Sequence, residues 1–175
     1  MTLDEFVNLP ESEQMELIDG QPVEKEPMGY AERIVQNKVG TFLETAQMEK
    51  PLGHVAVEGL IRINPDDPER GRRPDVSFIT FERLGDRSVD TAYIDVCPEI
   101  IVEVISPNDL SFDVHQKIAE YLAAGAKLVW EVQREQRQVL VHRPTGPIDR
   151  LNADDTLSGE DVLPTFSVEV AKLLS

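Results

Sequence analysis

The chain has 175 residues, which is enough for one domain with a substantial core. Its 33 Asp and Glu residues and 17 Lys and Arg residues give a net charge of −16. This charge argues against tight, nonspecific binding to DNA, because proteins bind the phosphate backbone mainly through Lys and Arg. No apolar run approaches the roughly 20 residues that span a bilayer, the acidic N-terminus lacks the order of a signal peptide, and the single cysteine, Cys97, excludes an internal disulfide. We therefore expect a cytoplasmic protein without a membrane partner.

The first 48 residues are expected to contain helices and one turn. A short helix is predicted at residues 3–8, and Ser12, with acidic residues after it, is typical of the N-cap of a second helix. The pair Asp19-Gly20 is a turn signal between two short apolar stretches. Apolar residues then recur at helical spacing over residues 30–48, which predicts the first long helix.

The pattern then changes to that of extended chain. Apolar residues alternate over residues 55–63, as in a half-buried strand, and a polar loop follows at residues 64–73. A short run at 75–80 precedes a nearly continuous apolar run at 99–106, EIIVEVIS. A run of this kind, rich in β-branched residues, is typical of a central strand that is covered on both faces.

The C-terminal half begins with a helix, which is followed by strands. Pro107 ends the apolar run, Asp109 or Ser111 is expected to cap a helix that extends to about residue 124, and Gly125 is expected to end it. Strands are predicted at residues 128–132 and 139–142, and the remainder is expected to be acidic loop with a last amphipathic stretch at 168–174. This order predicts a single α/β domain, with a mixed central β-sheet flanked by helices, a core at about 13–143 and an acidic C-terminal extension at 144–175.

Two carboxylates are the residues most suggestive of chemistry. Asp75 follows Pro74, which favours extended backbone before it, and Glu103 lies inside the apolar run. A buried, unpaired carboxylate is costly, so Glu103 has either an arginine partner, a place at the exposed rim of the sheet, or a bound cation. If the two strands are neighbours, the two carboxylates converge, and such oxygen ligands favour a hard cation, Mg²⁺ or Mn²⁺.

The predicted helix after Pro107 carries a lysine on a polar face. Asp113, Lys117 and Tyr121 are spaced four residues apart and therefore lie along one side of the helix. One interpretation is an ordinary surface ion pair between Asp113 and Lys117. The other is that Lys117 positions an attacking water or stabilises the charge that develops on a phosphate.

These residues resemble a known family. The Pro-Asp followed by a Glu in an apolar strand is the pattern of the PD-(D/E)XK, or restriction-endonuclease-like, nucleases. Four segments are similar more narrowly to the Uma-two-type endonucleases, namely MELIDGQPVE, RRPDVSFI, CPEIIVEVISPND and DVHQKIAEYLAAGAKLVWEV. The resemblance implies a restriction-endonuclease-like fold and Mg²⁺-dependent cleavage of DNA.

The resemblance also implies roles for individual residues. Asp75 and Glu103 match the metal-binding acids, and the backbone carbonyl of Val104 matches a third ligand. Glu16 matches an acid that reaches the metal through water.

The chain departs from the family pattern in two places. Ile105 stands where a lysine is expected, so Lys117 is the matching lysine, displaced onto the helix, and Tyr121 matches a tyrosine found there. Ala31 and Glu32 replace a histidine, which puts a contribution of that helix to the cleft in doubt.

The sequence therefore predicts a metal-dependent endonuclease that hydrolyses phosphodiester bonds in DNA. Lys117 would orient the attacking water with help from Glu16, and Arg72 or Arg73 would hold a flanking phosphate. Two alternatives stay open: a non-cleaving nucleic-acid-binding or protein-interaction module with the same fold, and an enzyme for another phosphoester. Cutting both strands of a duplex usually needs two sites, so a homodimer is also possible.

Overall fold

A six-stranded mixed sheet forms the centre of the computed structural model, which describes residues 1–175. The strand order is β10-β9-β8-β7-β6-β3, and β7 and β8 are the one parallel pair of neighbours. The strands span Gly53–Val57 (β3), Val76–Thr80 (β6), Ile100–Val104 (β7), Leu128–Gln133 (β8), Gln138–His142 (β9) and Asp149–Asn152 (β10). All five residues of β7 are buried, as its apolar sequence predicts.

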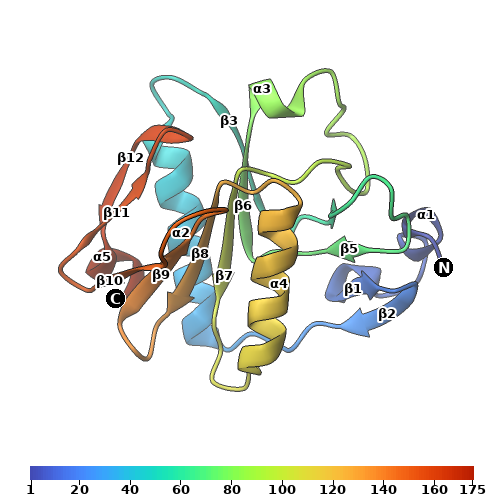
Figure 1. Cartoon of the computed structure of the whole chain (residues 1–175), viewed down its shortest axis with the longest axis horizontal. Helices are drawn as coiled ribbons and strands as arrows, with labels where there is room; N and C mark the ends of the chain where they lie inside the picture. Colours follow the sequence, from blue (N-terminus) through green and yellow to red (C-terminus); the bar gives the residue numbers. More distant parts are fainter.

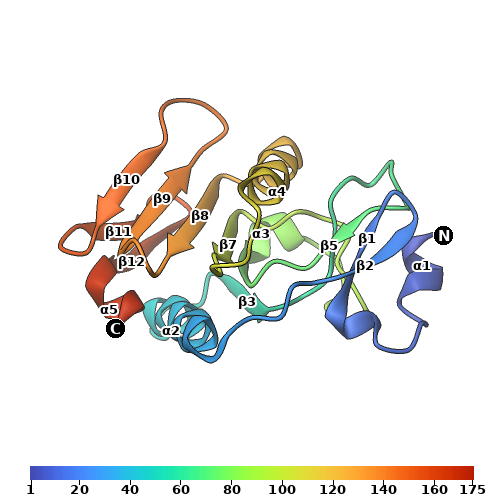
Figure 2. The same cartoon turned by 90° about the horizontal axis from the view of Figure 1, so that it is seen from below.

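Helices cover both faces of this sheet, which confirms the predicted fold class. Helix α2 (Tyr30–Ala46) lies on one face, and helix α4 (Ser111–Ala123) lies on the other (Figure 2). Alternate residues of β7 point to opposite faces, so Val102 packs in the core beneath α2 and Ile101 packs with the apolar residues of α4. None of the helices combines the length and apolar character that crossing a membrane requires.

A smaller sheet lies beside α4, at the N-terminal end of the molecule (Figure 1). Its order is β2-β1-β5-β4, and its strands span Met15–Ile18 (β1), Gln21–Glu24 (β2), Ile61–Arg62 (β4) and Gly71–Arg72 (β5). Helix α1 (Leu3–Phe6) packs against it through a separate small core that contains Leu17. A one-turn helix, α3 (Phe81–Leu84), follows β6.

The helix expected after Ser12 is absent, and that prediction was wrong. Ser12–Gln14 form a single 3₁₀ turn, and the chain then enters β1. The reason is the turn at Asp19 and Gly20, whose φ angles of 49° and 74° are those of a tight hairpin that pairs β1 with β2. Strand pairing outweighs the local helix signal, so Glu16 lies on a strand.

The C-terminal segment is also not the loop that was expected. It contains β10 and then a hairpin of β11 (Thr156–Gly159) and β12 (Leu163–Glu169), which leads to α5 (Val170–Leu174). Leu163 and Phe166 are buried in the main core, and the ring of Phe166 stacks on Trp130 with centroids 5.1 Å apart. The acidic residues of this segment therefore form the outer side of a packed element.

Candidate functional site

A cleft of about 360 Å³ lies between the end of β7, helix α4 and the β1–β2 hairpin. The antiparallel register pairs Val76 with Val102, so the next position brings Asp75 opposite Glu103 on the face of the sheet toward α4. Both carboxylates line the cleft, as do Lys117 and, from β1, Glu16. The fold thus brings together four residues that are far apart in the sequence.

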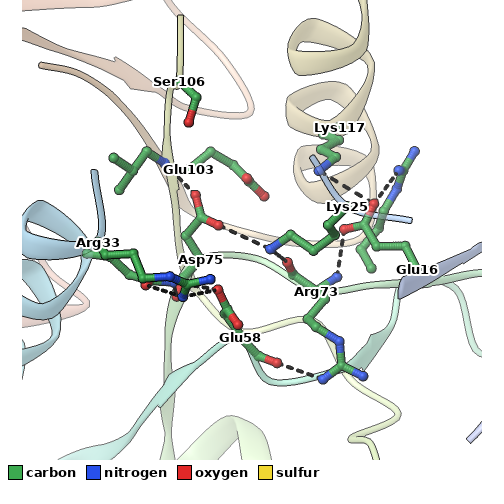
Figure 3. A network of polar contacts seen from close by, with 12 residues as sticks. Glu16, Lys25, Arg33, Glu58, Arg73, Asp75, Glu103, Ser106 and Lys117 are labelled. Atoms are coloured by element: carbon green, nitrogen blue, oxygen red, sulfur yellow. Dashed lines mark hydrogen bonds and ion pairs between the residues drawn. The ribbon is translucent and has the colours of Figure 1, made fainter. Parts of the chain in front are cut away.

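Asp75 is almost fully buried, with 4% of its surface exposed, and both of its oxygens have partners. Oδ2 accepts a hydrogen bond from the Val104 N–H at 2.7 Å, and Oδ1 lies 3.1 Å from the Nζ of Lys25. Lys25 also donates to the Arg73 carbonyl at 2.8 Å (Figure 3). Burial raises the pKa of Asp75 although Lys25 and the Val104 N–H oppose the shift.

Glu103 is also buried but lacks a cationic partner. It is 7% exposed, and its one hydrogen bond comes from the Tyr121 hydroxyl, which donates to Oε1 at 2.7 Å. No Lys, Arg or His nitrogen lies within 4.0 Å of its oxygens, so the arginine partner and the exposed rim considered above are both absent. Burial raises the pKa of Glu103 to about 7, with Lys117 opposing and Asp75 adding to the shift.

Lys117 lies next to Glu16 instead of Asp113. Its Nζ is 3.5 Å from the Glu16 Oε2, so the surface pair with Asp113 does not form (Figure 3). Glu16 also accepts hydrogen bonds from the Arg72 side chain and the Arg73 N–H, both at 2.9 Å. Burial alone would raise the pKa of Glu16, but Lys117 and Arg72 outweigh it and lower the pKa. The pair is therefore charged, and Asp113 lines the cleft with its side chain exposed.

The three arginines before Asp75 are engaged with other parts of the protein. Arg72 binds both oxygens of Glu120, and Arg70 pairs with Glu120 and Asp19. The Arg73 guanidinium donates to the backbone carbonyls of Ser12, Met15 and Glu58. Arg70 and Arg72 of this predicted basic cluster are thus paired with carboxylates inside the fold, and the Arg73 guanidinium is bound to backbone carbonyls, so neither Arg72 nor Arg73 is free to hold a flanking phosphate.

Two residues of the site, Lys25 and Gln36, were not predicted from the sequence. Lys25 is the single basic residue among residues 1–26, a signal that could have marked it, but its contact with Asp75 depends on the unpredicted hairpin. Gln36 of α2 donates to the Asp75 carbonyl at 3.1 Å, so α2 does contribute to the site. Glu32 points elsewhere and pairs with Arg134 at 3.0 Å.

The donor set suits a hard cation that keeps part of its water shell. No group of three or more His, Cys, Asp or Glu side chains forms a metal cage. The cleft instead offers two carboxylates and strand-end backbone, all oxygen donors, of the kind that Mg²⁺ uses together with water. Glu103 is buried without a cationic partner, and a bound cation would offset the cost of its charge.

Comparisons with known proteins identify the family and the fold of the chain. The model of the Uma2 family, described as "Putative restriction endonuclease", matches residues 3–171. The crystal structure of a putative nuclease belonging to DUF820 from Anabaena variabilis is similar over 99% of this chain and 97% of that chain, with 20% identity and a TM-score of 0.85. This likeness confirms the fold. Among curated proteins, no sequence matches the chain.

Proposed function

Since the chain belongs to the Uma2 family of putative restriction endonucleases, we propose that it is a metal-dependent endonuclease that hydrolyses phosphodiester bonds in DNA. The observation that carries the proposal is the convergence of buried Asp75 and Glu103 at one cleft, where Glu103 has no cationic partner. We also propose that residues 1–175 act as one domain, because the C-terminal hairpin completes the main core.

Asp75, Glu103 and the Val104 carbonyl would hold Mg²⁺ or Mn²⁺. When bound, such an ion polarises a phosphate and lowers the pKa of a coordinated water. Tyr121 fixes the orientation of Glu103 through its hydroxyl, and the Val104 N–H does the same for Asp75. The protein therefore holds both carboxylates in place before any substrate arrives, which reduces reorganisation during the reaction.

Lys117 would act as a fixed cation beside the reacting phosphate. Burial lowers the pKa of this amine, but the neighbouring Glu103 and Glu16 outweigh burial and raise it, so the ammonium stays protonated. A protonated lysine stabilises negative charge and orients water, but it does not accept a proton. Glu16, held by Arg72, keeps the ammonium at the cleft.

The charge of the cleft region favours one alternative. The arginines near the site are all engaged, and the chain as a whole carries −16, so few cations face a phosphate backbone. The second candidate is a non-cleaving nucleic-acid-binding or protein-interaction module, and the shortage of free cations favours its protein-interaction form. It would bind without a need for metal and release no products.

Nicking of supercoiled plasmid with Mg²⁺, Mn²⁺ or EDTA tests the proposal. We expect metal-dependent nicking that Asp75→Ala and Lys117→Ala both abolish. Loss in Asp75→Ala alone would support the metal site but remove the role of Lys117. If the wild-type protein cleaves neither plasmid, single strands nor RNA with either metal, the non-cleaving module becomes the better interpretation.

A further inference from the structure

Lys25 binds a carboxylate that the proposed function gives to a metal ion. Its ammonium lies 3.1 Å from the Oδ1 of Asp75, and its side chain is only 15% exposed. We propose that Lys25 is a built-in competitor of the divalent cation, which must displace this ammonium from Asp75 before it binds. The inference rests on the proposed function, since it concerns the same site.

The two oxygens of Asp75 differ in how easily they can be released. Oδ2 accepts from the backbone N–H of Val104, which is fixed by the pairing of β6 with β7. Oδ1 is bound by a flexible side chain with four methylene groups, which can move without any change in the sheet. An incoming cation would therefore take Oδ1 and displace Lys25.

The attachment of Lys25 permits this movement. Lys25 directly follows β2, and its backbone N–H donates to the Gln14 carbonyl at 3.0 Å, so its Cα stays at the edge of the cleft. The other contact of the ammonium is the Arg73 carbonyl, a neutral group. Only the contact with Asp75 is thus between opposite charges, and a divalent cation competes for it directly.

The balance of charge points the same way. Asp75 and Glu103 together carry two negative charges when ionised, and Lys25 neutralises one of them, while Lys117 is paired with Glu16. A divalent cation balances both carboxylates, which leaves the Lys25 ammonium in excess. Two cations near one carboxylate repel each other, so the lysine weakens metal binding as long as it stays.

Calorimetric titration with Mn²⁺ of the full chain tests the competition. The isosteric Lys25→Met variant should bind Mn²⁺ about tenfold more tightly or better than the wild type, because one repelling charge in contact with Asp75 is gone. Lys127→Met is the matched control, since Lys127 is exposed and forms no ion pair, and its affinity should be unchanged. Equal or weaker binding by a folded Lys25→Met variant would overturn the proposal.

A second measurement uses the wild type, so that it does not depend on the folding of a variant. Reductive methylation followed by peptide mapping reports how accessible each amine is. Mg²⁺ should speed the modification of Lys25 severalfold and leave that of Lys127 unchanged, and no change at Lys25 would count against displacement. Metal binding without plasmid cleavage would overturn the proposed function alone, whereas the absence of Mn²⁺ binding in all variants would overturn both.

Discussion

Replacement of Glu103 by Gln is expected to stabilise the protein at alkaline pH. Burial raises the pKa of this carboxyl from its ordinary value of 4.5 to about 7, with Lys117 opposing and Asp75 adding to the shift. The pKa of Glu103 is therefore higher in the folded protein than in the unfolded chain. The resulting stabilisation is complete below the unfolded-state pKa, and it is lost as the pH rises through about 7. At about 1.36 kcal/mol per pKa unit, ionised Glu103 destabilises the fold by about 3 kcal/mol near pH 8.5.

Glutamine has nearly the same shape as glutamate, can still accept from the Tyr121 hydroxyl, and never ionises. Glu103→Gln should therefore increase the free energy of unfolding by about 3 kcal/mol near pH 8.5, which is a rise in the melting temperature of roughly 6–12 °C for a domain of this size. Near pH 5 the gain should be about 1 kcal/mol or less, because folded Glu103 is then neutral. Urea unfolding in EDTA at both pH values measures the difference.

Glu131 is a matched control, since it lies beside Glu103 on the neighbouring strand β8. Burial would raise the pKa of Glu131, but hydrogen bonds with His142 and Gln133 outweigh burial and lower it. Glu131→Gln should thus destabilise the protein at both pH values. The prediction is refuted if Glu103→Gln does not increase the free energy of unfolding near pH 8.5, or increases it equally near pH 5. Ionised Glu103 would then not destabilise the fold.

Four further outcomes are expected. Arg72→Met removes one cationic partner from buried Glu16, which keeps Lys117, and one from half-buried Glu120, which keeps Arg70, so it should lower the free energy of unfolding by about 1.5–3 kcal/mol in urea titrations. Tyr121→Phe removes the hydroxyl that donates to Glu103 but keeps the ring, so it should reduce that free energy by about 1–2 kcal/mol; an unchanged free energy would contradict a contribution of this hydrogen bond. Mn²⁺ affinity, measured by calorimetry, should rise over roughly pH 6–8, because Glu103 loses its proton with a pKa of about 7. An affinity that does not change over this pH range would contradict the prediction. Phe166→Ala should cost about 3–5 kcal/mol in a single unfolding transition, whereas a separate early transition would contradict one domain.

The sequence predicts the central layer of the fold well, because its signals are local. The apolar run around Glu103 has one face beneath α2 and one beneath α4, so nearly every residue in it is apolar and the run is easy to recognise. The convergence of Asp75 and Glu103 follows from the neighbouring positions of β6 and β7. The resemblance to a family, which the match over residues 3–171 confirms, implies that these two acids meet at one site.

The parts that the sequence does not predict depend on contacts between distant segments. Ser12 has the local pattern of a helix cap, but pairing of β1 with β2 and β5 decides the structure. The C-terminal hairpin has an irregular register between Ser158 and Gly159, which interrupts the alternation that marks a strand. Lys25 reaches Asp75 over 50 positions in the sequence, a contact that no local pattern encodes.

The hydrogen bond from the Val104 amide to the Asp75 carboxylate gives the site its own spectroscopic reporter. This amide donates to the side chain that is expected to hold the cation, and it belongs to β7, a strand whose five residues are all buried. Any ion that draws electron density from Asp75 should weaken this bond and change the amide chemical shift, with no substrate or label required. Nuclear magnetic resonance of a single backbone position could therefore follow occupancy of the cleft in solution.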